Sequence, residues 1–252
     1  MPRVNRFRVA LQLYTIRSET AKDFLGACRA VKKIGYEFVE LAGFGGFEAP
    51  ALSYHLSEIG LRVSGSHVGL DAVTANATKT IEDHLAIGCK DVIVPWIPDE
   101  RRNSAKAWKE TGNLLEEAAQ KFREYGLRVG FHNHAVEFQK FEGATGWDLL
   151  FGEAPSLWAQ VDVFWVQYAD ADPVSVLAGV ANRVSSIHAK DMAADKKDIE
   201  FGLGVIDWKP VLAQCEKSGV ETLVVEMDDP KIAPLESARV SYENLQRLLK
   251  GG

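Results

Sequence analysis

The sequence lacks the features that indicate disulfide bonding, a membrane span or nucleic-acid binding. Its three cysteines are odd in number and form no CxxC pair, so Cys28, Cys89 and Cys215 are expected to be buried, reduced thiols. No uninterrupted run of about 18 apolar residues is present, which argues against a membrane span. A net charge of -6 offers no general attraction to nucleic acid or to an anionic membrane.

Two further absences bear on domain organisation and location. No Pro/Ser-rich linker or low-complexity tract divides the 252 residues, so we expect one domain over residues 1–252. The basic residues near the N-terminus precede an apolar run that is short and lacks a convincing small-residue cleavage site. We therefore interpret this run as a first strand and expect a cytoplasmic protein.

The chain does contain a regular alternation of short strand-like runs and longer amphipathic segments. The strand-like runs are residues 8–14, 38–43, 62–68, 91–97, 128–134, 158–164, 184–190 and 222–228. Such alternation predicts a parallel sheet with helical crossovers, and eight units in about 250 residues are typical of one fold. We expect an α/β protein that forms a single (β/α)8 TIM barrel.

Helix ends and turn residues support this organisation. Four amphipathic segments run into a glycine, as expected where a helix closes before the next strand: Gly35, Gly88, Gly126 and Gly219. A doubly wound sheet would use the same alternation, but no glycine-rich loop follows the first strand. Residues 191–205 are polar and glycine-punctuated and are expected to form a long loop.

Polar side chains recur at the carboxyl ends of the predicted strands, where barrel enzymes place their catalytic groups. They are Gln12, Glu40, His67, Trp96, His132, His134, Asp162, His188 and Glu226. His132, Asp162, His188 and Glu226 follow one another at intervals of one βα unit, so the fold would bring them together. Two imidazoles and two carboxylates suit one divalent ion, such as Mn, Co, Zn, Fe or Mg.

Each residue also has a purely structural alternative. A single histidine in a strand is more often hydrogen-bonded in the core than a ligand, whereas a lone buried carboxylate such as Asp162 needs a partner. The residues assigned to substrate binding are Gln12, Glu40, His67, Trp96, His134 and Trp165. His67 is open between substrate contact and structural hydrogen bonding, and Glu40 is open between support of the site from behind and a solvated loop charge. The other candidates are an apolar wall against a sugar ring, from Trp96 and Trp165, and binding of an oxyanion by Arg17 and Lys190. His55 and His84 fall on presumed helices and receive no role.

These residues resemble the xylose-isomerase-like, or sugar phosphate isomerase/epimerase, superfamily. The segments that carry the resemblance are LQLYTIR at 11–17, VEL at 39–41, FHNHAVEF at 131–138, DVFWVQYADADPV at 162–174, IHAKDM at 187–192, GLGVIDW at 202–208 and VVEMD at 224–228. Relatives hold a divalent ion through a carboxylate on strand five and an aspartate, a histidine and a glutamate on the next three strands. Asp162, His188 and Glu226 match that pattern.

This chain departs from the pattern on strand five, where His132 replaces the usual glutamate and His134 follows closely. The resemblance includes inosose dehydratase, whose segment is similarly rich in histidine, while Glu137 would supply a carboxylate only in a different strand register. The missing glutamate leaves the usual two-glutamate proton shuttle incomplete. His132, His134 or Lys190 would have to provide the second acid or base.

The expected function is a metal-dependent isomerase or epimerase that acts on a keto- or aldo-sugar or a polyol derivative through a metal-stabilised enediolate. Glu226 is the first choice for the base. The alternative is a metal-dependent dehydratase or lyase on a keto-sugar or inosose-like substrate, and a non-catalytic sugar-binding barrel is a third reading. We expect a small carbohydrate as partner, with no nucleic acid or membrane, and leave homo-oligomerisation open.

Overall fold

Eight parallel strands form a closed barrel in the computed structural model, which describes residues 7–251. The strands are β1 (Arg8–Gln12), β2 (Phe38–Ala42), β3 (Arg62–His67), β4 (Asp91–Val94), β5 (Arg128–His132), β8 (Trp158–Asp162), β9 (Val184–Ala189) and β12 (Thr222–Val225). Their order around the barrel is β1, β12, β9, β8, β5, β4, β3 and β2. Closure of β1 against β12 confirms the predicted (β/α)8 barrel and excludes the doubly wound sheet.

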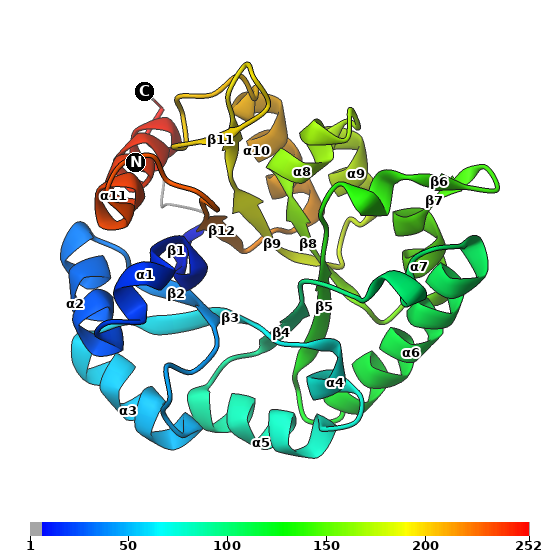
Figure 1. The fold of residues 1–252 in the computed structure, drawn as a ribbon, viewed down its shortest axis with the longest axis horizontal. Coiled ribbons are helices and arrows are strands. Elements are labelled where there is room, and N and C mark those ends of the chain that lie inside the picture. Colours follow the sequence, from blue (N-terminus) through cyan, green and yellow to red (C-terminus); the bar gives the residue numbers. More distant parts are fainter. Residues whose placement is uncertain (1–6, 252) are drawn as a thin grey trace.

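Helices surround the barrel as an outer ring (Figure 1). The longer ones are α2 (Phe24–Ile34), α3 (Ala49–Ile59), α5 (Ala77–Ile87), α6 (Ala105–Arg123), α7 (Gly146–Glu153), α10 (Trp208–Ser218) and α11 (Pro234–Leu249), with the seven-residue α9 (Pro173–Gly179). Each turns its apolar side to the strands, and α11 starts with proline at its first position. Gly88 and Gly219 close α5 and α10 in left-handed conformations, as the glycine pattern predicted.

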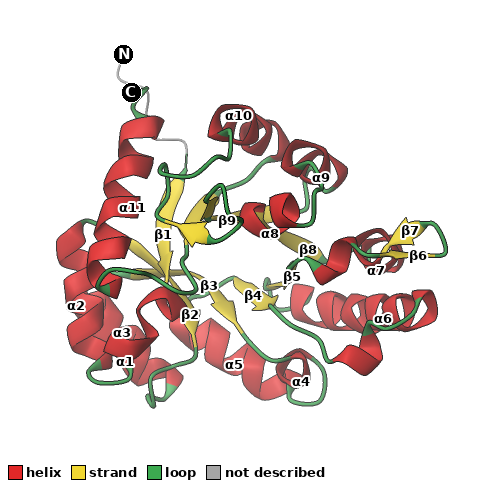
Figure 2. Cartoon of the chain, turned by 45° about the horizontal axis from the view of Figure 1, so that its top comes forward, coloured by secondary structure: helices red, strands yellow, loops and turns green. Residues whose placement is uncertain are grey.

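Short elements occupy the loops at the carboxyl ends of the strands (Figure 2). They are η1 (Leu13–Ile16), α1 (Arg17–Thr20), α4 (Leu70–Val73), η2 (Asp99–Arg101), η3 (Val136–Phe138) and α8 (Val163–Tyr168), with the hairpins β6 (Lys140–Phe141)/β7 (Ala144–Thr145) and β10 (Asp191–Met192)/β11 (Asp198–Ile199). Every barrel strand ends one to three residues before its predicted bound. The polar residues expected at the strand ends therefore stand at the mouth of the barrel.

The predicted loop 191–205 contains the β10/β11 hairpin and is organised by one buried carboxylate. Asp191 accepts hydrogen bonds from the backbone N–H groups of Met192 at 2.8 Å, Gly202 at 2.9 Å and Gly204 at 3.2 Å. A Cβ atom on Gly204 would come within 2.2 Å of Asp191 Oδ1, so this close approach requires glycine. The loop is thus a folded turn rather than a free connection.

The opposite end of the barrel is closed by a buried ion-pair group. Arg128 on β5 binds Asp91 on β4 through Nε at 2.5 Å and Nη2 at 2.7 Å, and its Nη1 contacts Glu221 at 2.9 Å. Its guanidinium also lies over the ring of Trp158. The three cysteines are buried and free, as expected, and among residues 7–251 no helix is long and apolar enough to cross a membrane.

Candidate functional site

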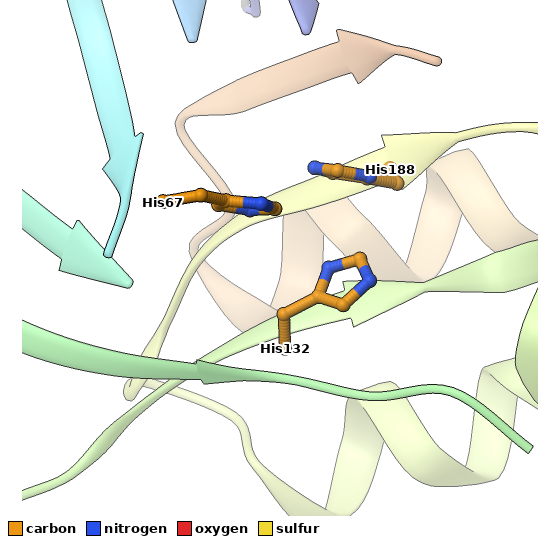
Figure 3. Close-up of side chains that lie close together, drawn as sticks. All are labelled: His67, His132 and His188. Atoms are coloured by element: carbon orange, nitrogen blue, oxygen red, sulfur yellow. The ribbon is translucent and has the colours of Figure 1, made fainter. Parts of the chain in front are cut away.

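Three histidines from three strands meet at the carboxyl end of the barrel (Figure 3). His67 ends β3, His132 ends β5 and His188 lies near the end of β9. The rings of His67 and His188 stack with centroids 5.4 Å apart and an interplanar angle of 6°, while the His132 ring stands edge-on, 4.5 Å from that of His188. His55 on α3 and His84 on α5 lie on outer helices, as the sequence suggested.

Two fully buried side chains set the orientation of these imidazoles from below. Glu40 accepts hydrogen bonds from Gln12 Nε2 at 2.7 Å and Gln160 Nε2 at 2.5 Å, and its Oε1 lies 2.7 Å from His188 Nε2. Gln160 Oε1 lies 3.0 Å from His132 Nδ1 and 2.7 Å from His67 Nε2. Because ionised carboxylate and amide oxygens can only accept, these contacts assign a proton to Nε2 of His188, to Nδ1 of His132 and to Nε2 of His67.

The remaining nitrogens face two carboxylates. His188 Nδ1 lies 2.8 Å from Glu226 Oε2 and 3.8 Å from Asp162 Oδ2, and His132 Nε2 lies 3.9 Å from the same Asp162 oxygen. Asp162 caps α8 with its other oxygen, which accepts from Trp165 N–H at 3.0 Å. Asp162 Oδ2 is buried and has no hydrogen-bond partner within residues 7–251. Such an orphaned acceptor is costly unless a ligand completes it.

Opposing charges shift the ionisation of this group strongly. Burial would raise the pKa of Glu226, but His188 and Lys190 outweigh it and lower this pKa to about 2. Burial raises the pKa of Asp162 to about 7, although Lys190 and His188 act against it. Burial would lower the pKa of His188, but the carboxylates of Glu226 and Glu40 raise it well above its usual range. The imidazolium of His188 and the ammonium of Lys190 therefore offset part of the negative charge of these carboxylates.

The segment after β5 is fixed by reciprocal contacts with its neighbours. Asn133 donates to the carbonyl oxygen of Asp162 and accepts from its N–H, which joins the ends of β5 and β8. Glu137 is buried on η3 and accepts the N–H of His134 at 2.7 Å. Burial raises the pKa of Glu137 to about 7, whereas burial lowers that of His134 to about 4. Glu137 thus supports His134 and does not replace the strand-five ligand.

Lys190 is a fully buried cation beside the carboxylates. Its Nζ pairs with Asp228, lies 3.9 Å from Glu226 Oε2 and sits over the rings of Phe164 and Trp165. Burial would lower its pKa, but the surrounding carboxylates raise it above the usual value. At neutral pH the side chain is therefore a fixed positive charge rather than a proton acceptor.

A cavity of about 880 Å³ opens above this group. Its lining includes five of the residues predicted from the sequence: His67, Trp96, His132, His134 and Glu226. Gln12 and Glu40, also predicted to touch substrate, are completely buried beneath the histidines, where an orienting role fits better. Trp165 is set back from the cavity and packs on His134. Arg17 is exposed on α1, over the Tyr14 ring.

The sequence reasoning missed Gln160, the residue that connects Glu40 with two of the histidines. The signal in the sequence is a polar residue inside the strand-like run WAQVDVF, but Asp162 two positions later is the stronger ligand candidate. It also missed Asp228, which pairs with Lys190 and lines the cavity. Both roles depend on contacts between strands that lie far apart in the chain.

The donor set fits a divalent cation. Two groups of side chains could hold an ion: Asp162, His188 and Glu226, and His67, His132 and His188. Ligand atoms about 2.1 Å from one cation lie roughly 3.4 Å apart when tetrahedral and up to about 4.2 Å apart when opposed, so the separations of 3.8 and 3.9 Å suit it. The 2.8 Å contact between His188 and Glu226 would have to widen.

Comparison with known proteins places the chain in a family. Residues 28–250 match the model of the xylose isomerase-like TIM barrel, so the chain belongs to that family. Over 193 residues, 65% of its length, it is 28% identical to the rhizopine catabolism protein MocC of Rhizobium meliloti, of which it spans 56%. It is 22% identical to the inosose dehydratase of Geobacillus kaustophilus, with 86% of this chain and 84% of that protein covered.

Among solved structures, a sugar phosphate isomerase/epimerase from Parabacteroides distasonis superposes with a TM-score of 0.86 at 20% identity and covers 98% of this chain and 96% of its own. At that identity the likeness concerns the fold.

Proposed function

We propose that the protein is a divalent-metal-dependent enzyme that removes a proton beside the carbonyl group of a sugar or polyol, with isomerisation or epimerisation as the outcome. The observation that carries the proposal is the unpartnered Asp162 Oδ2 together with His188 and with Glu226, which lines the cavity. His132 Nε2, held toward Asp162 by Gln160, is the fourth donor. When bound, the ion would supply Lewis-acid polarisation of the carbonyl oxygen.

The protein side chains provide the remaining chemistry. Glu226 is ionised and reaches the cavity, so it can accept the proton from the carbon next to the carbonyl. Lys190 lies 3.9 Å from Glu226 Oε2, and its positive charge favours the ionised form of that carboxylate. Of the three candidates for the second acid or base, His134 fits best, because it is neutral and lines the cavity, whereas Lys190 is completely buried and does not line it.

Elimination is the second candidate, and the similarity to inosose dehydratase along 86% of the chain favours it. The same proton removal followed by loss of a β-substituent yields a dehydrated or cleaved product. The two reactions share the Glu226 step and differ in what happens to the enediolate. Product mass separates them, because isomers keep the mass of the substrate.

Metal analysis of the purified protein and incubation with keto-sugars in D2O test the proposal. We expect bound divalent metal and solvent-derived deuterium in recovered sugar. Glu226→Gln should lower turnover by roughly 10²–10⁴-fold, the usual contribution of a positioned base. Retention of near-wild-type activity by a metal-loaded Glu226→Gln protein would refute its role as base. Undiminished metal content in both His132→Ala and Glu226→Gln would refute the metal site.

A further inference from the structure

The cavity has two ends of different chemistry. Around the strand ends its floor carries His67, His132 and His134 with Glu226. The loops that follow β3 and β4 contribute the apolar residues Leu70, Pro95, Trp96 and Pro98, here called the apolar wall, beside the charged Asp71, Glu100 and Arg101. A volume of about 880 Å³ lies near the top of the range of roughly 300–1,000 Å³ that buries drug-sized ligands. One sugar ring placed against the histidines would leave the apolar wall uncovered.

Trp96 is the most conspicuous side chain of that wall. It follows β4 and exposes 53% of its surface, although an indole is among the most favourable groups to cover. The guanidinium of Arg102 lies over its ring, 5.6 Å from the centroid, and Arg102 is itself held by Asp99 at 2.6 and 3.0 Å. The indole is thus supported in place and presents a ready aromatic surface to a ligand.

The charges of the cavity disfavour a phosphate group. Four lining residues are carboxylates, namely Asp71, Glu100, Glu226 and Asp228, and among the described lining residues Arg101 alone carries a full positive charge. Even with Glu226 assigned to a cation and Asp228 paired with Lys190, the two carboxylates of Asp71 and Glu100 oppose one guanidinium. A phosphate ester brings about -1.5 to -2 charges. Lys190, the cation nearest the floor, is already paired with Asp228.

We infer that the substrate is an unphosphorylated carbohydrate with two rings: one sugar ring, which carries the carbonyl group that the proposed function requires, lies against the histidine floor, and the second ring stacks on Trp96. The inference rests on the proposed function and names its substrate class. It separates this cavity from one built for a sugar phosphate, because the mouth offers an aromatic surface instead of a cluster of cations.

Matched ligand pairs test the second ring. We would measure dissociation constants by calorimetry, in the presence of Mn²⁺, for methyl and phenyl β-glycosides of glucose, galactose and xylose. For each sugar that binds, the phenyl compound should bind about tenfold tighter than the methyl compound. Trp96→Ala should reduce this ratio to about one, and Trp96→Phe should keep part of it. Tyr125→Ala is the matched control, since Tyr125 is 52% exposed beyond the end of α6 and does not line the cavity.

A second comparison tests the exclusion of phosphate: glucose 6-phosphate should bind no more tightly than glucose. Tighter binding of the phosphate that disappears in Arg101→Ala would overturn the inference, as would a phenyl-to-methyl ratio near one in the wild type or an unchanged ratio in Trp96→Ala. Deuterium exchange keeps the proposed function separate. Exchange without a phenyl preference refutes only the second ring, a Trp96-dependent preference without exchange refutes only the chemistry, and no binding of any sugar refutes both.

Discussion

The two ends of the barrel both bury charged side chains, yet they differ in how those charges are satisfied. At the amino end, Arg128 meets two carboxylates and an aromatic ring, and its bonds to Asp91 are bidentate. At the carboxyl end, an oxygen of Asp162 is left without a partner in the described chain, and carboxylates crowd around His188. Complete pairing marks a structural plug, whereas incomplete pairing marks a place that a ligand completes.

The largest expected effect is at Asp162. Asp162→Asn keeps an oxygen to cap α8 but removes the charge, so affinity for Mn²⁺ should fall by more than the roughly 10–100-fold typical of residues outside the ligand shell. Metal titration monitored by calorimetry measures this loss. Without metal at pH 8, urea unfolding should show a variant at least as stable as the wild type, because burial opposes ionisation of Asp162. A metal affinity equal to that of the wild type would remove the contrast between the two ends.

Arg128 provides the converse test at the amino end. Arg128→Ala leaves Asp91 buried without its partner and should cost about 3–5 kcal/mol in the free energy of unfolding. Metal affinity of the folded variant should stay within about twofold of the wild type. Arg62→Ala is the control, because its pair with Glu37 is exposed and should cost less than about 1 kcal/mol. Equal losses in the two variants would contradict the assignment of the Arg128 group as a structural plug.

Glu137 tests whether ionisation of a buried residue that supports the site, rather than of a proposed metal ligand, lowers the stability of the fold. Burial raises its folded pKa to about 7 from the usual value of 4.5, so the folded state binds the proton more tightly than the unfolded chain. Its contribution to stability is therefore present at low pH and is lost as pH rises through about 7, by roughly 2–3 kcal/mol between pH 5 and pH 8.

Glu137→Gln lacks this titration and should gain in stability relative to the wild type over the same interval. Urea unfolding of both proteins at pH 5 and pH 8, without metal, measures the difference, in which the other titrating groups largely cancel. Thr145, which caps α7 nearby through Asp148, offers a control: Thr145→Ser should show no such pH-dependent gain. A constant difference between the two proteins would show that Glu137 is not held protonated.

The sequence was sufficient to predict those features that recur at regular intervals along the chain. Alternation of strands and helices predicted the barrel, and the spacing of one βα unit brought Asp162, His188 and Glu226 into one group. It was insufficient for the contacts that set their protonation, because Glu40 and His188 are 148 residues apart and Gln160 and Glu40 are 120 apart. The linear pattern of residue types does not indicate which strands face each other across the barrel.

The same reason explains why the direction of single side chains could not be predicted from the sequence. Glu40 and Gln12 stand at strand ends like the ligands, but their side chains point beneath the histidines and have no exposed surface. Glu137 lies in the strand-five motif, yet it turns to the backbone of His134. Strand position predicts the level of a residue in the barrel, while the side-chain direction depends on the neighbours it meets.

The smallest expected effect is at Glu40, which connects the satisfied interior with the unsatisfied floor. His188 and His67 hold the pKa of Glu40 below its usual range against the effect of burial, so an ionised carboxylate accepts from His188 Nε2 and directs Nδ1 to Asp162 and Glu226. Glu40→Gln keeps the shape and weakens this orientation. Mn²⁺ affinity should fall about 10–100-fold, as for other outer partners of metal-binding histidines.

Ser186→Ala, which removes a different neighbour of Gln160, is the control and should leave Mn²⁺ affinity within about twofold of the wild type. Equal Mn²⁺ affinity of the Glu40→Gln and wild-type proteins would show that Glu40 has a structural role, like the charges at the amino end. A similar loss of affinity in Ser186→Ala would show that Gln160, rather than Glu40, orients the histidines.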